Sequence, residues 1–374
     1  MIHWQNTYAD ITSNVLSGWY GRKFLPGTRF YKIGKDGRAY WYADEGGKRR
    51  YIGKDSPELA AAMAQENMTS ELDKATKKMI RSLVSVGMPV PGREIGDTLH
   101  DLAWNGFFRL RGVLVGTVAF QTYFPMLGET PLDFFKKALR DCDFHGSLLA
   151  VSRTADIDIA RFHSISVAID DSMDVSLPNA LGPEFSQIPS ILPGHNLPKW
   201  RNGRTGLMVD LLAPLHASVS KDTTFLPGVG AIAAKLKFLD FLIYDEIPTV
   251  VLHGNGIPVN VPRPERYAVH KLIVTQERRN PVKADKDLVQ GIALCSFLLQ
   301  NHTATIRNAF SEAAERGPGW RRRLSATVKN GVFPEKLRNE FLPLLGKKEE
   351  NCKNTQEKDY GFQKDDCGFQ HGPR

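Results

Sequence analysis

Three short segments near the start of the chain combine aromatic and other apolar residues with basic ones, a composition typical of half-buried β-strands. They are residues 29–33, 38–42 and 48–52. The sequences between them, Lys35-Asp36-Gly37 and Gly46-Gly47, are typical of tight turns. We therefore predict a small antiparallel sheet in this part of the chain.

A helical pattern follows the predicted sheet. Ser56 is a suitable N-cap residue, and Pro57 suits the first helical position. Gly87 is expected to end this helix, whose apolar positions recur at helical spacing: Leu72, Met79, Leu83 and Val86. Proline and glycine in residues 88–92 indicate a linker, so we place a boundary near residue 90. A further short helix is predicted over 97–108.

Two later strand-like segments contain aspartates, which are poor strand formers. The segment 152–162 places Asp156 and Asp158 two positions apart, so both side chains point to one face of a strand. The apolar segment 206–214 carries Asp210 in its middle. A carboxylate in such a strand is destabilising unless it is paired or bound to a metal ion.

Metal binding would explain all three strand aspartates. Clustered carboxylates repel one another and raise each other's pKa, and a divalent cation removes that conflict. Hard oxygen ligands suit Mg²⁺ or Mn²⁺. Two such ions can hold the attacking and leaving oxygens of a phosphoryl transfer. The alternative for Asp210 is an ion pair with a nearby arginine such as Arg204.

Residues 112–127 have the composition of an anion site. The apolar stretch 112–115 is typical of a strand, Gly116-Thr117 interrupts it, and residues 118–127 are predicted to continue as a helix. Free backbone N–H groups and the helix dipole meet at a helix N-terminus. Glycine lets the backbone approach a phosphate closely, and the Thr117 hydroxyl can donate to it. Many α/β turns carry Gly-Thr, so this pattern alone is not specific.

The C-terminal part of the chain has helical patterns. Pro264 is expected to start a helix that carries His270 and Lys271. The next helix buries one face through apolar residues at helical spacing: Leu288, Ile292, Cys295 and Leu299. After Gly346 the chain is polar and charged, so we predict that residues 347–374 form a disordered tail.

Composition restricts the class of protein. The chain has 374 residues, enough for two or three domains, and no apolar run as long as the ~18–20 residues of a membrane helix. The four cysteines lack metal-type spacing, which suits a reducing compartment and argues against a disulfide scaffold. We find no secretory signal pattern and expect a cytoplasmic protein. The net charge of +8 favours an anionic partner.

Positive charge is concentrated in the predicted sheet. Residues 21–54 hold ten Lys and Arg against three Asp and Glu. Several aromatic residues are interleaved with these cations: Tyr31, Tyr40, Trp41, Tyr42 and Tyr51. Such a surface can stack bases and bind phosphates. The alternative is that the aromatic residues form the core of this small sheet and the charges its solvated face.

Taken together, Gly116-Thr117, the Asp156-x-Asp158 pair and Asp210 resemble the DNA polymerase β-like nucleotidyltransferase superfamily. More closely, the chain resembles a bacterial family of stand-alone nucleotidyltransferase-fold proteins over about residues 20–345. That resemblance rests on the segments 40–59, 116–120, 154–162, 209–212, 261–274, 283–290 and 317–320. It implies an α+β fold with a mixed-sheet nucleotidyltransferase core, preceded by the small antiparallel sheet plus helix and followed by a helical region.

The resemblance implies roles for the motif residues. Asp156 and Asp158 would bind the nucleotide-associated Mg²⁺ or Mn²⁺, and together with Asp210 they would bind the catalytic ion. Asp210 is also expected to assist deprotonation of the acceptor hydroxyl. Gly116 and Thr117 would hold the β and γ phosphates. The turn and the aspartate pair are farther apart here than in the smallest superfamily members, so residues 129–150 are expected to loop out and return.

The resemblance also makes Lys271 the best candidate for a triphosphate contact, with Asp287 as the partner that orients it. Lys283 lies near the start of the same predicted helix as Asp287 and is a supporting candidate. The alternative is that Lys271 is an ordinary solvated lysine. His270 is more typical of a buried structural histidine than of a catalytic group.

These patterns divide the chain into residues 1–90, the core 91–260, the helical region 261–346 and the tail. The implied function is Mg²⁺-dependent transfer of a nucleoside monophosphate from an NTP to a hydroxyl of RNA or tRNA, a protein or a small molecule. A catalytically silent protein of this fold that binds nucleic acid or senses a nucleotide is the alternative. No membrane partner is expected, and the patterns do not indicate an oligomeric state.

Overall fold

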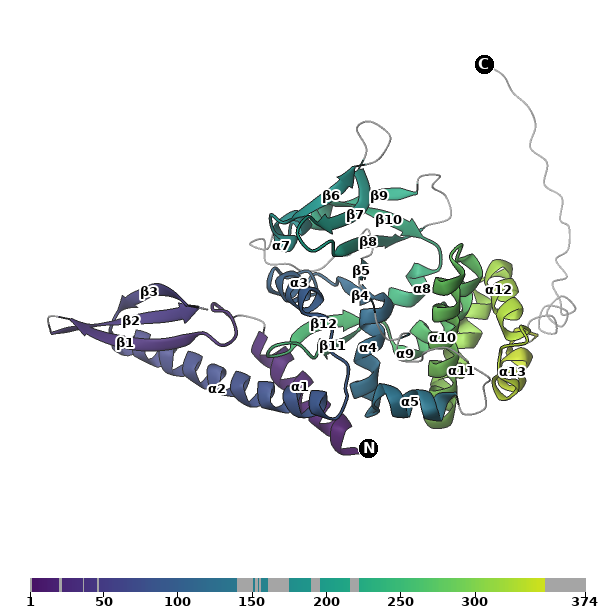
Figure 1. Cartoon of the computed structure of the whole chain (residues 1–374), viewed down its shortest axis with the longest axis horizontal. Helices are drawn as coiled ribbons and strands as arrows, with labels where there is room; N and C mark the ends of the chain where they lie inside the picture. The colour runs from purple at the N-terminus through teal and green to yellow at the C-terminus, as the bar shows by residue number, and fades with distance from the viewer. Residues whose placement is uncertain are drawn as a thin grey trace, which may run out of the picture.

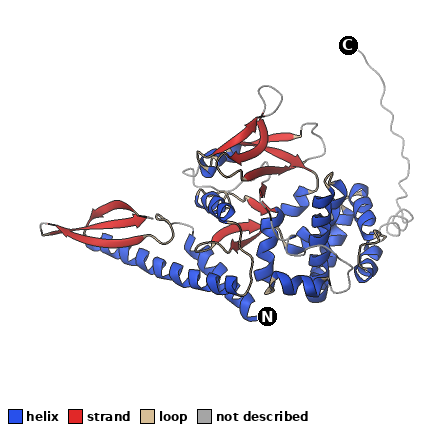
Figure 2. Cartoon of the chain, viewed as in Figure 1, coloured by secondary structure: helices blue, strands red, loops and turns tan. Residues whose placement is uncertain are grey.

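A computed structural model gives the fold of the chain (Figures 1 and 2). It describes residues 2–19, 22–35, 37–45, 47–139, 151, 154, 156–160, 175–189, 196–215 and 222–346. The predicted disordered tail lies outside these residues.

An antiparallel sheet and a long helix form the N-terminal extension seen on the left of Figure 1. Strands β1 (Arg29–Lys35), β2 (Arg38–Glu45) and β3 (Lys48–Lys54) pair in the order β1-β2-β3. Helix α2 (Pro57–Ser85) follows, and the Ser56 side chain accepts from the backbone N–H of Leu59, as the cap pattern predicts. The sheet and the capped helix were thus predictable from local sequence signals.

A helix that the sequence analysis did not predict precedes this sheet. Helix α1 (Ile2–Trp19) packs its buried residues into the main hydrophobic core. The Tyr8 hydroxyl lies 2.7 Å from the Thr249 hydroxyl and donates to the carbonyl of Val250 at 2.6 Å. The division of the chain near residue 90 therefore does not separate α1 from the core.

A mixed sheet forms the centre of the molecule. Its main path runs β4-β5-β8-β10-β9, in which the β5–β8 and β8–β10 pairs are parallel and the β4–β5 and β10–β9 pairs antiparallel. Strand β7 also pairs with β8, and β6 pairs with β7. The strands are β4 (Val113–Val115), β5 (Asp156–Ala160), β6 (Phe185–Pro189), β7 (Asn196–Asn202), β8 (Met208–Pro214), β9 (Thr223–Leu226) and β10 (Ala231–Leu236).

Short helices and a hairpin surround this sheet. The helix predicted over 97–108 is displaced, because α3 starts before residue 97 and ends ahead of Gly106, which has a φ of +84°. The segment 129–150, which was expected to loop out, contains helix α5. The elements are α3 (Arg93–Trp104), α4 (Gly116–Leu127), α5 (Pro131–Ala138), α7 (Leu177–Leu181), the 3-10 turn Pro227–Val229, α8 (Leu239–Ile243), β11 (Ile247–Val251) and β12 (Ile257–Val261).

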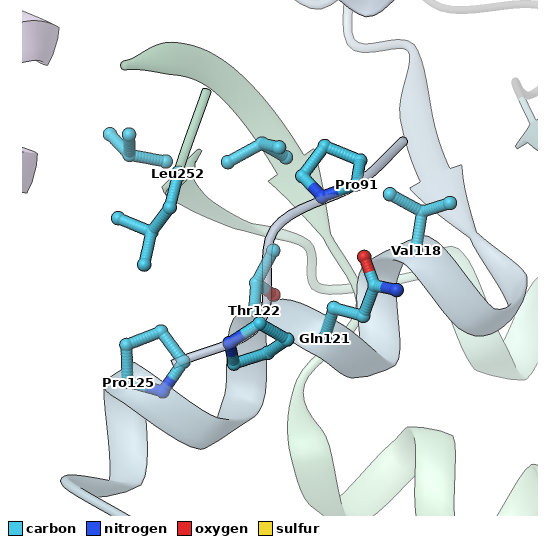
Figure 3. Close-up of a pocket in the computed structure, with 9 residues that line it drawn as sticks. Pro91, Val118, Gln121, Thr122, Pro125 and Leu252 are labelled. Carbon is cyan, nitrogen blue, oxygen red and sulfur yellow. The ribbon is translucent and has the colours of Figure 1, made fainter. Parts of the chain in front are cut away.

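The proline-containing linker packs against α4. Figure 3 shows Pro91 facing Val118 and Gln121 of α4, with Leu252 beyond β11 nearby. The cavity between them is about 10 Å³, room for about one water molecule. This near-complete packing fixes α4, whose N-terminus belongs to the site described below.

The C-terminal helices pack side by side at the right of Figure 1. The Phe310 and Phe341 rings stack with centroids 4.6 Å apart, which ties the last helix to this layer. These elements are α9 (Pro264–Val274), the 3-10 turn Thr275–Glu277, α10 (Pro281–Asn301), α11 (Thr303–Glu315), α12 (Pro318–Val328), α13 (Glu335–Phe341) and the 3-10 turn Leu342–Leu345. No helix among the described residues has both the length and the apolar composition needed to cross a bilayer.

Candidate nucleotidyltransferase site

Two of the three strand aspartates lie directly opposite each other. Asp158 of β5 is in register with Asp210 of β8, and these neighbouring strands run parallel. Residues in register on adjacent strands present their side chains to the same face. The two carboxylates therefore share one spot, as the sequence analysis predicted.

The alternation of the strands explains this placement. Ile157 and Ile159 of β5 and Val209 and Leu211 of β8 are all fully buried in the main core. Because successive side chains of a strand point to opposite faces, burying these aliphatic residues puts the aspartates on the other face. Asp156 lies at the start of β5, two residues before Asp158, and its side chain is exposed.

The N-terminus of α4 lies against the same spot. Val115 of β4 pairs with Asp158, and α4 begins at the next residue, Gly116. Gly116 has a φ of +69°, and a Cβ on it would lie 2.4 Å from Asp158 Oδ2. Only glycine combines this backbone conformation with this close approach. Thr117 follows in the first turn of α4 and is half-buried. The structure therefore places Gly116 against Asp158, and a role of Gly116 and Thr117 in phosphate binding stays a prediction.

A lysine that the sequence analysis missed binds one of the aspartates. Lys199 of β7 pairs in register with Asp210, and its Nζ lies 2.7 Å from Asp210 Oδ2. The alternative that named Arg204 as the partner of Asp210 is wrong in its residue, because Arg204 Nε lies 3.0 Å from Glu184 Oε2 instead. Asp210 Oδ1 is buried and accepts no hydrogen bond among the described residues. One oxygen of Asp210 is thus paired, and the other is available.

Burial and a neighbouring charge raise the pKa of Asp158. Desolvation, followed by the negative charge of Asp210, raises the pKa of Asp158 from its usual 3.8 to about 6. The positive charges of Lys271 and Arg278 act in the opposite direction. A carboxylate so perturbed in a shared site is typical of functional positions.

Lys271 lies in a buried ion-pair network, so the solvated alternative is wrong. Its side chain is 8% exposed and its Nζ contacts Oδ1 of Asp287, whose side chain is 6% exposed. Arg278 Nε donates to the other oxygen of Asp287 at 2.6 Å. Burial alone would raise the pKa of Asp287, but these two cations lower it below its usual value. The geometry confirms the Lys271–Asp287 contact, and a role in triphosphate binding stays a prediction.

Hydrogen bonds tie the α4 N-terminus to the C-terminal helices. Tyr267 of α9 is fully buried, and its hydroxyl lies 2.9 Å from the Gly116 carbonyl and 2.9 Å from Gln290 Oε1. Gln290 in turn donates to the carbonyl of Val151, shortly before β5, at 2.8 Å. This network holds Gly116 beside Asp158. Tyr267 and Gln290 were missed because nothing in their sequence spacing indicates contact with a distant glycine.

Two further predicted residues, His270 and Lys283, and their neighbour Lys286 lie on α9 and in the first turns of α10. Desolvation, with the Lys271 charge as the next cause, lowers the pKa of His270 to about 3, so this histidine is neutral at pH 7. This agrees with the expected structural role. Lys283 is exposed in the first turn of α10. Lys286 is partly buried, and its pKa is lowered by desolvation and by Lys271.

The carboxylates of the site provide some, but not all, of the ligands that a hard divalent cation needs. Asp158 and Asp210 supply carboxylate oxygens, and the unpartnered Asp210 Oδ1 is available for coordination. Among the residues that the structure describes, however, no three His, Cys, Asp or Glu side chains are grouped so that they could hold a metal ion. A bound ion would thus require the exposed Asp156 to turn toward the pair, or the Lys199–Asp210 pair to open.

Comparison with known proteins identifies the family. A nucleotidyltransferase family matches residues 93–315, which include Gly116, the strand aspartates and the Lys271–Asp287 pair. No curated protein and no solved structure matches the chain. The matched region and the α+β architecture confirm the predicted fold class and the predicted relationship. The chain belongs to this family of nucleotidyltransferases.

Proposed function

We propose that the protein transfers a nucleoside monophosphate from an NTP to an acceptor hydroxyl. The acceptor oxygen forms a bond to the α-phosphorus, the bond between that phosphorus and the oxygen bridging to the β-phosphate breaks, and pyrophosphate leaves. The proton of the hydroxyl passes to a carboxylate, for which Asp210 is the candidate. The acceptor class is a hydroxyl of RNA or tRNA, a protein or a small molecule.

One observation carries this proposal: Asp158 and Asp210 lie in register beside the N-terminus of α4, where Gly116 leaves room for Asp158. Two carboxylates and a helix N-terminus bring together negative ligands and free backbone N–H donors. Phosphoryl-type transfer depends mainly on positioning and on charge stabilisation, so these few groups are of the types that the reaction needs. The family match supports the same class of reaction.

The phosphates would be held by groups around the α4 N-terminus. In this proposal the backbone N–H groups and the Thr117 hydroxyl donate to the β and γ phosphates. Lys271 supplies positive charge to the triphosphate, and Asp287 fixes its position through the buried contact. Lys283, exposed at the start of α10, is a supporting candidate for the outer phosphate oxygens.

We further propose that the transfer depends on Mg²⁺ or Mn²⁺, with Asp156, Asp158 and Asp210 as the ligands. Such an ion, when bound, would neutralise phosphate charge. Two observations support this assignment: Asp210 Oδ1 accepts no hydrogen bond among the described residues, and the pKa of Asp158 is raised by desolvation and by the neighbouring charge of Asp210. The protein's own contribution is to hold the two strands in register.

A labelling experiment tests the proposal. The full chain is incubated with each α-³²P-NTP, Mg²⁺ or Mn²⁺, and total RNA or cell extract. We expect label to enter an acceptor as pyrophosphate is released, and we expect Asp158→Asn and Asp210→Asn each to lower this rate by about a hundredfold or more. The matched control is Asp10→Asn, because Asp10 is an exposed aspartate on α1. Equal labelling by all variants would exclude the site.

The Lys199–Asp210 ion pair favours a second candidate, a catalytically silent protein that binds nucleic acid or senses a nucleotide. Lys199 already neutralises one carboxylate, as a retained structural pair would. In that case NTPs raise the thermal unfolding midpoint, but no NTP yields pyrophosphate with any acceptor fraction. Mg²⁺-dependent labelling that is lost in Asp158→Asn would eliminate this candidate.

A further inference from the structure

The two faces of the N-terminal sheet differ in what covers them. One face packs against α2 and forms a small hydrophobic cluster of Phe24, Ala43 and Met63 with Phe30, Trp41, Ile52 and Leu59. The Trp41 indole N–H is satisfied there, because it donates to Asp55 at 2.8 Å. The sheet therefore has a core that contains none of its tyrosines.

The opposite face carries a row of tyrosines, one from each strand. Tyr31 of β1 is in register with Tyr42 of β2, which is in register with Tyr51 of β3. The ring centroids lie 6.1 Å apart for the first pair and 5.6 Å apart for the second. Tyr31 is 37% exposed and Tyr51 56% exposed, and neither described hydrophobic cluster includes the row. The Tyr42–Tyr51 pair continues the register that starts at the β2–β3 turn, and the register shift lies just beyond it, between Trp41 and Tyr42.

Basic side chains lie beside the tyrosine row. The Arg49 guanidinium lies 4.0 Å from the Tyr42 ring centroid and 6.0 Å from that of Tyr31. Arg49 is exposed and has no described carboxylate within ion-pair distance, and the same holds for Arg29, Arg38 and Lys48. The surrounding segment, residues 21–54, carries ten Lys and Arg against three Asp and Glu.

A further basic residue lies on the face of the row. Arg29 lies two residues before Tyr31 on β1, so both side chains emerge on the same face. Arg29 also borders a cavity of about 540 Å³, but its lining is of mixed charge and includes Glu45 and Asp73 besides lysines of α2. A phosphate backbone laid along the row would therefore meet Arg29 and Arg49.

We infer that Tyr31, Tyr42, Tyr51 and Arg49 form a binding surface for a single-stranded RNA segment. Exposed aromatic rings provide stacking partners for unpaired bases, and arginine binds the phosphates between them. A duplex keeps its base faces inside the helix, so it cannot use the rings in this way. RNA is preferred to DNA because its 2′-hydroxyl groups can hydrogen-bond with the tyrosine hydroxyls. That this RNA supplies the acceptor hydroxyl rests on the proposed function, whereas the binding surface does not.

Binding is measured by fluorescence anisotropy with the full chain in EDTA, without NTP, using a labelled U-rich RNA of about 12 nucleotides. We expect Tyr31→Ala and Tyr51→Ala each to weaken binding by about tenfold, and Tyr51→Phe to keep most of the affinity because the ring remains. Arg49→Gln should reduce the slope of log K against log salt concentration by about one. The control is Phe225→Ala, an exposed aromatic residue of β9 that lies outside the row.

Three outcomes overturn the inference. The first is wild-type affinity in both alanine variants while their thermal midpoints also match the wild type. The second is tighter binding to an RNA duplex or to a DNA strand of the same sequence than to the RNA strand. The third is binding to anionic lipid vesicles, but not to RNA, that is lost in the alanine variants. Repeating the measurement with Asp158→Asn separates this inference from the proposed function, because RNA binding should persist when transfer is lost.

Discussion

Lys199 Nζ lies 2.7 Å from Oδ2 of Asp210, on strands that place the two residues directly opposite each other. Asp210 thus has a cation on one side and, in register on its other side, the carboxylate of Asp158. Lys199 is 45% exposed at its side chain and Asp210 23%, so solvent screens this ion pair. The lysine can leave without large loss of stability, and a divalent ion would compete with it for the same carboxylate.

We predict that Lys199→Met strengthens Mn²⁺ binding. Removing the competing cation frees Asp210 Oδ2 and leaves more negative charge at the site. Because exposed ion pairs contribute at most about 1 kcal/mol, the expected gain in affinity is up to about fivefold. Titration calorimetry with Mn²⁺ measures it, with Lys237→Met, an exposed lysine outside the site, as the control. Weaker Mn²⁺ binding in Lys199→Met would show that the lysine supports the site and does not compete for it.

Asp158 is expected to reduce the stability of the folded protein at neutral pH. Its pKa is raised from 3.8 to about 6 by desolvation and then by Asp210, so between these values the folded state binds more protons than the unfolded state. The free energy of unfolding therefore falls as pH rises through this window and stays lower above it. In EDTA at about pH 7.5, we expect Asp158→Asn to be more stable than wild type by about 1–3 kcal/mol, a range reduced because Asp158 is partly exposed.

Urea unfolding at about pH 4 and about pH 7.5 measures this difference. The stabilisation by Asp158→Asn should be nearly absent at the lower pH, where wild-type Asp158 is protonated. Asp10→Asn serves as the control because Asp10 is exposed. Equal or lower stability of Asp158→Asn at both pH values would mean that its carboxylate is already compensated in the folded protein.

Local signals in the sequence were sufficient to predict where much of the site lies. The alternation of Ile157 and Ile159 with the aspartates fixes which face of β5 is buried, and the same pattern in β8 places Asp210. Gly116 was also found, because a glycine between a strand and a helix is typical of a tight turn that a ligand or another backbone approaches closely. What these signals have in common is that each depends on neighbours within a few residues.

Other features depend on long-range packing and were not predictable. Lys199 reaches Asp210 only because β7 pairs with the first half of β8, whereas β10 pairs with the second half. The burial of Lys271 depends on Asp287, from a different helix. Helix α1 has no capping signal, and its place in the core comes from contacts with β11, more than two hundred residues away in sequence.

Gly116→Ala should damage the site more than the fold. The added Cβ would lie 2.4 Å from Asp158 Oδ2, and the φ of +69° is unfavourable for alanine. We expect Asp158 to be displaced and labelling to fall by about a hundredfold, with a loss of stability of about 1–3 kcal/mol from backbone strain. Gly87→Ala is the matched control, because Gly87 has a φ of +95° but no atom close to its Cβ position. If both variants label equally, contact with Asp158 is not what requires glycine at residue 116.

Variants of the Lys271–Asp287 pair can show whether this ion pair serves the fold or the reaction. Asp287→Asn leaves Lys271 buried without a carboxylate, so we expect a loss of about 3–5 kcal/mol in urea unfolding. Lys271→Met should lose less, because Asp287 keeps its contact with Arg278.

The double variant Lys271→Met/Asp287→Leu removes both buried charges and replaces them with apolar side chains. We expect its stability to return to within about 2 kcal/mol of wild type, since buried pairs are often replaceable by well-packed apolar residues. If Lys271 acts on the triphosphate, labelling stays at least about tenfold below wild type despite the regained stability. A stable double variant that labels at the wild-type rate would assign the pair to folding alone, because both charges would be gone while the aspartates and the α4 N-terminus remained in place.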